Sequence, residues 1–250
     1  MGLYASEHAG VKTMKGLHLF HFVLSNCSQR VRFALEEKEL PWESHHLNLA
    51  ANEHVSEDYQ SINPDGVVPT LVHDGQVVIE SNDILGYIDV HFPAPRLAPE
   101  DPAERARMQA HITLASGAQG SIKALSHELL FRPFRKVGDE ELALYEEKAA
   151  NRELVAFLRD YAEEGPAWQR RVKLANADME QRLDSLEAAL ANDRWLSGAS
   201  FGLADISWVV NAHRLQQAQY DLAGWPSLLP WYERVASRPA FDRAIASYPP

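Results

Sequence analysis

The chain has 250 residues, of which 46% are hydrophobic, so it is long enough to bury a sizeable core in one or two domains. Its formal net charge of -11 argues against general affinity for nucleic acid or anionic membrane surfaces, which attract cationic proteins. The single cysteine excludes an intramolecular disulfide framework and suits a reducing, cytoplasmic compartment. No apolar run approaches the ~20 residues that a membrane span needs.

The first part of the chain alternates strand-like and helix-like patterns. Residues 1–16 lack the apolar stretch of a secretory signal, and we expect a loose N-terminal extension there. A short apolar strand over 17–22 leads into a polar elbow at 25–28, which opens a helix that Pro41 ends. The order of these elements predicts one small α/β unit.

The pattern continues with a strand near 42–49 and a short helix near 53–62. A hairpin is expected at Asp74-Gly75, because β-branched runs flank this favoured turn dipeptide. The α/β domain therefore spans residues 17–92. Four prolines within 93–102 predict a stiff linker without regular structure.

Everything after the linker, residues 103–250, has helical patterning. We expect one long helix over 104–130, which Pro133 should break, and a helical stretch over 139–162. From Val172 onward, apolar residues recur in alternating steps of three and four, which indicates a helix with a buried face. Two short helices that begin with proline are expected near the end of the chain.

Five segments with this spacing resemble the glutathione-binding unit of the cytosolic glutathione transferases. They are the strand at 17–22, the elbow at 25–28, the run from Gly66 to Val72, the following hairpin, and Glu80-Ser81. The resemblance implies an α/β thioredoxin-like N-terminal domain that binds glutathione as co-substrate, followed by an all-α helical-bundle domain that supplies a hydrophobic substrate wall. It also implies a homodimer.

Two segments bear on the subfamily. The elbow and the helix after it resemble those of zeta-class transferases (maleylacetoacetate isomerases) and of tetrachlorohydroquinone dehalogenase. The long segment 131–168 resembles the dehalogenase group and the bacterial β-etherases, and it exceeds what zeta enzymes carry. The resemblance therefore favours a dehalogenase-like or β-etherase-like enzyme and keeps a zeta-type isomerase as an alternative.

The elbow suits activation of glutathione, which attacks as its thiolate. Lowering the pKa of a free thiol from ~8.5 by two units requires about 2.7 kcal/mol. A hydrogen bond from a hydroxyl to a charged group contributes ~1.5–3 kcal/mol and a helix N-terminus ~0.3–1 kcal/mol. By its match to the serine of theta and zeta enzymes, Ser25 is interpreted as this donor, with a simple helix N-cap as the alternative.

Cys27 matches the position of a functional cysteine in the zeta enzymes and the dehalogenase. In the dehalogenase, the resemblance implies a cysteine that accepts glutathione from a thioether intermediate as a mixed disulfide. A lone cysteine at a helix start is also commonly an inert, buried small residue. Asn26 is a further candidate for contact with the thiolate.

Five more residues are candidates for binding glutathione. Val68-Pro69 matches the family's cis-proline, which implies that the backbone of Val68 pairs with the cysteinyl part of the tripeptide. At Glu80-Ser81, the N-H groups and hydroxyl of a helix start would hold the γ-glutamyl carboxylate, and Glu80 would pair with the α-amino group. His54 lies where zeta enzymes place a glutamine that contacts the glycyl end.

Two features serve no predicted chemistry. Gly202 stands where most transferases have Ser or Thr before the aspartate that corresponds to Asp205, which removes the side-chain half of a capping box. The eleven histidines show no metal-ligand spacing, so we expect no metal site.

The predicted reaction is attack of the glutathione thiolate on a small hydrophobic electrophile, expected to be aromatic, by conjugation, reductive dehalogenation or β-aryl ether cleavage. The alternatives are a zeta-type cis-trans isomerase and a noncatalytic binding module, since fold does not fix function. A thiol oxidoreductase acting through Cys27 is less favoured, because the chain has no Cys-x-x-Cys pair.

Overall fold

The structure, a computed structural model, describes residues 2–6 and 8–248. The first half of this part of the chain is built around a mixed sheet of five strands. The strands are β1 (Gly2–Ala5), β2 (Leu17–His21), β3 (Trp42–His46), β4 (Thr70–His73) and β5 (Gln76–Ile79). Their order across the sheet is β1-β5-β4-β2-β3. The β2 and β3 strands are parallel, whereas the other neighbours are antiparallel.

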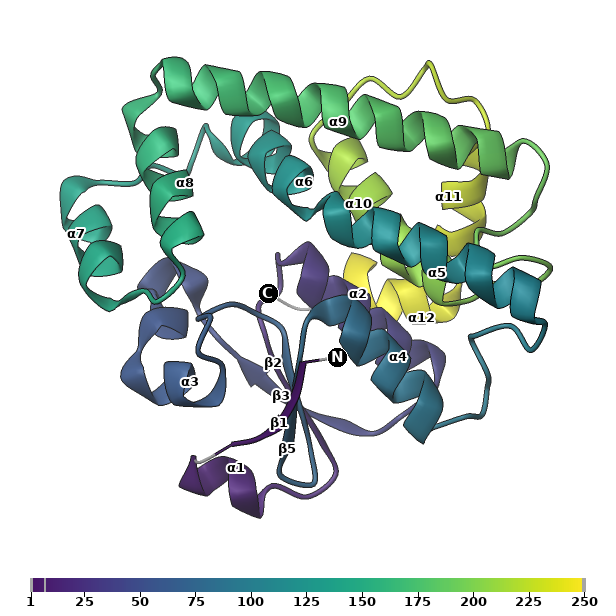
Figure 1. Ribbon diagram of the computed structural model, residues 1–250, viewed down its shortest axis with the longest axis horizontal. Coiled ribbons are helices and arrows are strands. Elements are labelled where there is room, and N and C mark those ends of the chain that lie inside the picture. The colour runs from purple at the N-terminus through teal and green to yellow at the C-terminus, as the bar shows by residue number, and fades with distance from the viewer. Residues whose placement is uncertain (1, 7, 249–250) are drawn as a thin grey trace.

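Helices cover both faces of the sheet. They are α1 (Ala9–Thr13), α2 (Asn26–Glu37), α3 (Glu57–Ile62) and α4 (Ser81–His91), with 3-10 turns at Leu49–Ala51 (η1) and Glu53–Val55 (η2). The α1 and α3 helices pack on one face, where Val11 and Tyr59 join a small apolar cluster with Phe20 of β2. The α2 and α4 helices pack together on the other face, between the sheet and the second half of the molecule (Figure 1).

The second half is helical. Its helices are α5 (Pro102–Gly117), α6 (Gln119–Leu125), α7 (Asp139–Lys148), α8 (Arg152–Glu163), α9 (Pro166–Leu190), α10 (Leu203–Gln217), α11 (Leu228–Ala236) and α12 (Pro239–Phe241), with π-helical turns η3 (Ser126–Phe131) and η4 (Asp242–Ala246). The α/β half followed by this helical half confirms the predicted fold class. In the described part of the chain, no helix is long and apolar enough to cross a membrane.

The α2 helix is deeply buried at the junction of the two halves. All eight residues from Ser28 to Leu35 are buried, because α2 is packed against α4 on one side and α10 and η4 on the other. Two arginines, Arg30 and Arg32, therefore lie inside the protein, where a guanidinium needs hydrogen-bond partners. Arg30 belongs to the candidate site, because it lies on this buried helix close to Cys27.

The expected loose extension over residues 1–16 is wrong for most of its length. Residues 2–5 form β1, which pairs antiparallel with β5 so that Gly2 lies opposite Ile79. Residues 9–13 form α1. An added strand covers the hydrogen-bonding edge that β5 would otherwise expose, and this pairing gains backbone hydrogen bonds that local sequence does not signal. Residues 1 and 7 lie outside the described part.

The single long helix expected over 104–130 is also wrong. The α5 helix ends at Gly117, α6 begins at Gln119, and a π-helical segment follows. Arg182 of α9 reaches into this junction, and its Nη1 donates to the carbonyl of Leu114 at 2.7 Å. A Cβ at Gly117 would lie 2.9 Å from the same Nη1, so the guanidinium packs closely against this glycine. A tertiary contact from α9 therefore lies at the boundary between α5 and α6.

The predicted hairpin forms as expected, and one predicted helical stretch is divided into two helices. The hairpin forms at Asp74-Gly75, whose φ angles of 50° and 82° suit a two-residue turn with positive φ at both positions. The helical stretch over 139–162 is two helices, because the side chain of Asn151 caps a new helix by accepting from Leu154 N at 3.0 Å. Residues 93–101 of the proline-rich stretch lie between α4 and α5, and Pro102 is the first residue of α5.

Candidate active site

Ser25 lies at the N-cap of α2. Its Oγ accepts a hydrogen bond from the backbone N-H of Ser28 at 3.2 Å, so the residue is a helix cap. A hydroxyl has two lone pairs and one proton, and the cap uses a lone pair only. The O-H of Ser25 donates to no partner among the described residues, so capping and donation to a thiolate are compatible.

Cys27 is half-buried in the first turn of α2, and Arg30 lies three residues further along the helix. Arg30 Nη1 is 3.8 Å from Cys27 Sγ and donates to Ser81 Oγ at 2.7 Å. Its Nε donates to the carbonyl of Ser207 in α10 at 3.1 Å. One guanidinium therefore connects the elbow, the start of α4 and the helical half.

The charge of Arg30 is only partly compensated. The side chain is 1% exposed, its Nη2 has no hydrogen-bond partner, and it forms no ion pair with a carboxylate of the described residues. Burial lowers the pKa of this guanidinium, while the neighbouring Cys27 acts in the opposite direction. An isolated buried cation is costly, so the guanidinium of Arg30 favours a negative charge nearby, such as a thiolate at Cys27.

The start of α4 offers further donors. Glu80 is its N-cap residue, with φ at 66° and no side-chain hydrogen bond to the helix, so the first backbone N-H groups of α4 are left uncapped by this residue. Ser81 begins the helix and is buried beside Arg30. Partial burial raises the pKa of the Glu80 carboxyl, and the Asp65 and Asp83 carboxylates add to this. The hydrogen-bond donors at the start of α4, which could hold an anion, therefore lie beside the carboxyl groups of Glu80, Asp65 and Asp83.

The Val68-Pro69 peptide bond is cis, as the resemblance implies. The carbonyl of the preceding Val67 accepts from Tyr59 Oη at 2.7 Å and from Asn63 Nδ2 at 2.9 Å. The backbone N-H and C=O of Val68 itself find no partner in residues 2–6 and 8–248. They are therefore available to pair with an extended ligand backbone.

Asn26 has a structural contact that the sequence did not predict. Its Nδ2 donates to Oδ1 of Asn211 in α10 at 2.9 Å, which joins the elbow to the helical half. Asn211 is fully buried, and its Nδ2 has no hydrogen-bond partner. The open amide donor of this pair therefore belongs to Asn211.

His54 is buried at the end of the first half that faces α7. Its Nε2 lies 2.9 Å from the hydroxyl of Tyr145, and its Nδ1 has no partner. Burial lowers the pKa of His54 to about 4, so the ring is neutral at pH 7. Tyr145 also donates to Asn52 Oδ1 at 3.0 Å, so the segment 131–168 packs against the predicted glycyl end of the site.

Two more cations lie near Cys27. Arg214 of α10 is 4% exposed, donates through Nη2 to the carbonyl of Leu24, and has an unpartnered Nε. Burial lowers its pKa to about 10, against an opposing effect of Cys27. Lys123 of α6 lies with Nζ 4.2 Å from the ring centre of Phe157, and burial lowers its pKa to about 8, with Cys27 among the opposing groups. The region around the thiol is cationic.

Sequence reasoning assigned no role to Arg30, Asn211, Arg214 or Lys123. For Arg30 a signal was present, because residues three apart on a helix share a face and Cys27 was already a candidate. For the other three no signal existed, because only the packing of α6 and α10 against the first half places them near the elbow.

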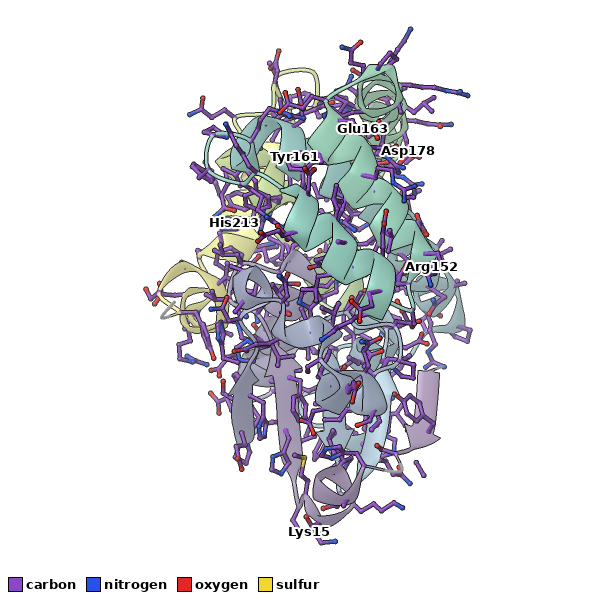
Figure 2. The ribbon with its side chains drawn as sticks, turned by 90° about the vertical axis from the view of Figure 1, so that its left-hand side faces the viewer. Lys15, Arg152, Tyr161, Glu163, Asp178 and His213 are labelled. Atoms are coloured by element: carbon purple, nitrogen blue, oxygen red, sulfur yellow. The ribbon has the colours of Figure 1, made fainter. Side chains whose placement is uncertain are left out.

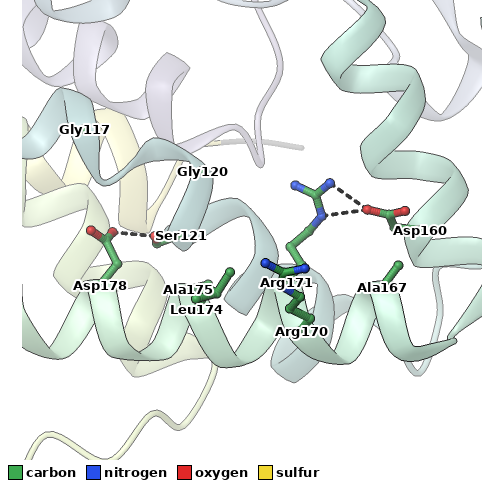
Figure 3. A pocket seen from close by; sticks show the side chains of 10 residues that line it. All are labelled: Gly117, Gly120, Ser121, Asp160, Ala167, Arg170, Arg171, Leu174, Ala175 and Asp178. Carbon is green, nitrogen blue, oxygen red and sulfur yellow. Dashed lines mark hydrogen bonds and ion pairs between the residues drawn. The ribbon is translucent and has the colours of Figure 1, made fainter.

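A separate pocket of about 530 Å³ lies on the outer side of the helical half, between α6, α8 and α9 (Figure 3). Two ion pairs or hydrogen bonds border it: Arg171 with Asp160 at 2.7 Å, and Ser121 with Asp178 at 2.5 Å. None of the predicted site residues lines this pocket. The chemistry-bearing residues therefore lie elsewhere, at the junction of the two halves.

Comparison with known proteins agrees with this geometry. Residues 19–96 match the model of the glutathione S-transferase N-terminal domain, and residues 150–234 match that of the C-terminal domain. The chain is 30% identical to glutathione S-transferase Z1 of Arabidopsis thaliana, over 94% of this chain and 93% of the relative. It therefore belongs to the glutathione transferase family.

Two further similarities concern the subfamily. The tetrachloro-p-hydroquinone reductive dehalogenase of Sphingobium chlorophenolicum is 27% identical over 92% of this chain and 96% of that protein. The crystal structure of the β-etherase LigF from Sphingobium sp. strain SYK-6 superposes with a TM-score of 0.80 at 26% identity, covering 91% of this chain and 98% of LigF. The predicted resemblance to these groups is confirmed.

Proposed function

We propose that this protein is an enzyme that binds glutathione at the junction of α2 and α4 and directs its thiolate at a small hydrophobic, aromatic electrophile. One observation carries the proposal. Arg30 bridges Cys27 Sγ and Ser81 Oγ with a nitrogen left over, beside the free hydroxyl of Ser25. Donors from two distant segments, the start of α2 and the start of α4, thus lie close together where an anionic sulfur and a carboxylate would be bound.

Each part of the tripeptide has a chemically matched partner. The γ-glutamyl carboxylate is held by Ser81 and the first N-H groups of α4, with its ammonium near Glu80. The cysteinyl backbone pairs with the free N-H and C=O of Val68, next to Pro69. The glycyl residue lies toward His54, whose unpartnered Nδ1 accepts a hydrogen bond from the glycyl N-H, because Tyr145 donates to Asn52 and so leaves the imidazole proton on Nε2.

The thiolate is stabilised without a general base. A serine hydroxyl has no useful acidity at pH 7, so Ser25 donates a hydrogen bond and removes no proton. The hydrogen bond and the N-terminus of α2 together contribute about 2–4 kcal/mol, enough to hold a thiol pKa two units below its free value. The positive charge of Arg30 acts in the same direction.

Cys27 serves a reductive second step in this proposal. After displacement of a halide, the Cys27 thiolate attacks the sulfur of the glutathionyl thioether, and the carbon keeps the bonding pair and takes a proton. The product is a Cys27-glutathione mixed disulfide, which a second glutathione thiolate cleaves to release glutathione disulfide. The half-buried sulfur beside Arg30 suits such an attacking thiol.

A zeta-type cis-trans isomerase is the second candidate, and the two cations near Cys27 favour it. Reversible addition of the thiolate to a maleyl double bond permits rotation, and elimination returns glutathione unchanged. Lys123 and Arg214 would bind the carboxylates of such a substrate. The long segment with α7 and α8 counts against this candidate, because zeta enzymes lack it.

The deciding experiment is glutathione-dependent turnover across chlorinated quinols, β-aryl ethers and maleyl compounds. Turnover of the first two classes supports the main proposal, and turnover of maleyl compounds alone supports the isomerase. Absence of turnover with all three, together with no heat of glutathione binding in calorimetry, would overturn both. Binding without any turnover would leave the noncatalytic module.

Two variants test the roles at the elbow. Ser25→Ala should leave glutathione affinity nearly intact and reduce turnover by more than tenfold, and unchanged turnover would refute the assignment. Cys27→Ser should abolish reductive release while sparing the first displacement. Loss of neither step would leave Cys27 structural.

The assembly and location belong to the same proposal. We infer a cytoplasmic homodimer, supported by the family resemblance and by the single cysteine. Light scattering on the purified chain separates a dimer from a monomer, and fractionation of cells that express it tests the location.

A further inference from the structure

Two histidines and a glutamate meet on the sheet, far from the candidate active site. The parallel register of β2 and β3 places His18 opposite Glu43 and Phe20 opposite His45. Because side chains alternate along a strand, these four lie on one face, the face that α1 and α3 partly cover. One ligand atom from each of His18, Glu43 and His45 lies within 4.8 Å of the others.

The distances suit a small metal ion. His18 Nδ1 is 3.0 Å from His45 Nε2. His18 Nδ1 is 3.5 Å from Glu43 Oε2, and His45 Nε2 is 3.6 Å from Glu43 Oε1. Zinc bonds nitrogen and oxygen at about 2.0–2.2 Å in a tetrahedron, which separates neighbouring ligand atoms by about 3.4 Å. The three side chains therefore already stand near the spacing of a metal-ligand set.

The tautomer of His18 is set for ligation. Its Nε2 lies 3.0 Å from the backbone carbonyl of Lys15, and a carbonyl only accepts, so Nε2 carries the proton. Nδ1 then presents a lone pair toward His45. Histidines that bind metals commonly donate their second ring N-H to such a carbonyl, which orients the ring.

His45 is held in place as well. Its ring stacks on Phe20 with 4.5 Å between the ring centres and 17° between the planes. The side chain of Glu43 is 65% exposed, which leaves an entry path from solvent.

We propose that His18, Glu43 and His45 form a binding site for a divalent transition-metal ion, with zinc the ion best matched to two imidazoles and a carboxylate and with water in the fourth position. In the metal-bound state, the metal ion takes the place of the hydrogen-bonding proton between His18 Nδ1 and His45 Nε2. It ties the edge strand β3 to β2 at the end of the molecule where Lys15 lies, opposite the helical half (Figure 2). Its effect is on the stability of this edge and not on turnover.

The test is calorimetric titration of the untagged, metal-free full chain with zinc chloride, repeated with cobalt(II), whose visible absorption reports tetrahedral coordination. His18→Gln keeps a donor for the Lys15 carbonyl and lacks Nδ1, and His45→Asn and Glu43→Gln remove the other ligands. His46→Asn is the matched control, because His46 lies on the same strand and points to the opposite face. Cys27→Ser excludes binding by the lone thiol.

One zinc per chain is expected for the wild type, the His46→Asn control and Cys27→Ser. Affinity should fall at least tenfold in His18→Gln and His45→Asn, and zinc should raise the melting temperature of the wild type but not of these variants. Glu43→Gln should also lower the affinity, and zinc affinity unchanged by either Glu43→Gln or His18→Gln, or no zinc binding by the wild type, would overturn the proposal. Glu43 is exposed, so Glu43→Gln gives a decision even if His18→Gln fails to fold.

Discussion

The helices α2 and α10 pack against each other, yet the buried charges near their first turns are treated in opposite ways. Asp205 of α10 has no exposed surface and accepts four hydrogen bonds, from the backbone N-H groups of Leu196, Ser197 and Gly202 and from Nε1 of Trp231, at 2.9, 3.3, 3.0 and 2.9 Å. The chain itself meets the needs of this carboxylate.

Arg30 of α2 is as deeply buried as Asp205, but one of its nitrogens has no partner and no carboxylate of the described residues pairs with it. Burial without full compensation costs free energy. The difference teaches that Asp205 serves the fold, whereas the uncompensated Arg30 is the group that we propose binds glutathione. Changes at the two positions should therefore affect different measurements.

The largest expected effect is that of Asp205→Ala on folding. Loss of the carboxylate leaves four buried donors without their acceptor, so the free energy of unfolding should fall by about 3–5 kcal/mol in urea denaturation. Asp193→Ala is the control, because Asp193 forms a partly exposed ion pair with Arg107 at 3.2 Å and should cost no more than about 1 kcal/mol. Equal losses in the two variants would break the comparison.

Gly202→Ser tests the same turn from the backbone side. A Cβ at Gly202 would lie 2.2 Å from the carbonyl oxygen of Leu97 and 2.9 Å from Ser197 Oγ. Restoring the family's Ser or Thr should therefore destabilise the chain, by about 3 kcal/mol, and thermal unfolding measures the loss. A stabilised Gly202→Ser variant would show that the turn has room for a side-chain cap.

Arg30→Met should act mainly on glutathione. Loss of the guanidinium removes charge-assisted hydrogen bonds of about 1.5–3 kcal/mol, so the dissociation constant for glutathione should rise tenfold to a hundredfold in calorimetry. The loss of unfolding free energy should be smaller than in Asp205→Ala, because an incompletely paired buried charge is removed. Arg30→Lys is the charge-conserving control. Unchanged glutathione affinity in Arg30→Met contradicts the assignment of Arg30 to the site.

The smallest expected effect concerns His213, on the same helix as Asp205 but near its other end. Burial lowers the pKa of His213 to about 4, and its Nδ1 lies 2.8 Å from the hydroxyl of Tyr232. The unfolded chain, with a histidine pKa near 6.5, takes up the proton first as pH falls. Stability should therefore decrease from about pH 6.5 down to about 4, with a loss of about 1 kcal/mol at pH 5.5.

Urea denaturation of the wild type and His213→Gln at pH 7.5 and 5.5 measures this contribution. The difference between the two proteins should shrink at the lower pH, because the variant lacks the buried imidazole. An identical pH dependence in both would place the acid sensitivity in other buried histidines.

The comparison also shows which parts of the site were predictable. Ser25 and Ser81 follow from local rules, since polar residues at helix starts and their spacing are visible in the chain. The sequence indicates that Asp205 serves folding, next to a helix cap that Gly202 weakens. The structure shows why a glycine is present at position 202. Ser197 Oγ accepts from Ala204 N at 3.0 Å and replaces the missing cap, while the Leu97 carbonyl occupies the space of a larger residue.

Contacts between distant segments were not predictable. The hydrogen bond between Asn26 and Asn211 joins residues 185 positions apart. The β1 strand pairs with β5, which lies at the other end of the first half in sequence. His18 and His45 share no sequence spacing that signals a metal site, and only the register of two parallel strands brings them together. The hydrogen bond at the end of α5 also comes from Arg182 of another helix.

The sequence by itself determined the class of fold, the positions of the elbow and the α4 start, and the hairpin, because caps, turns and periodicity act over a few residues. Only the tertiary structure decided which buried charges are satisfied by the chain and which are left for a ligand. That distinction depends on whether a donor from another element lies within hydrogen-bond distance, and local sequence does not contain such distances.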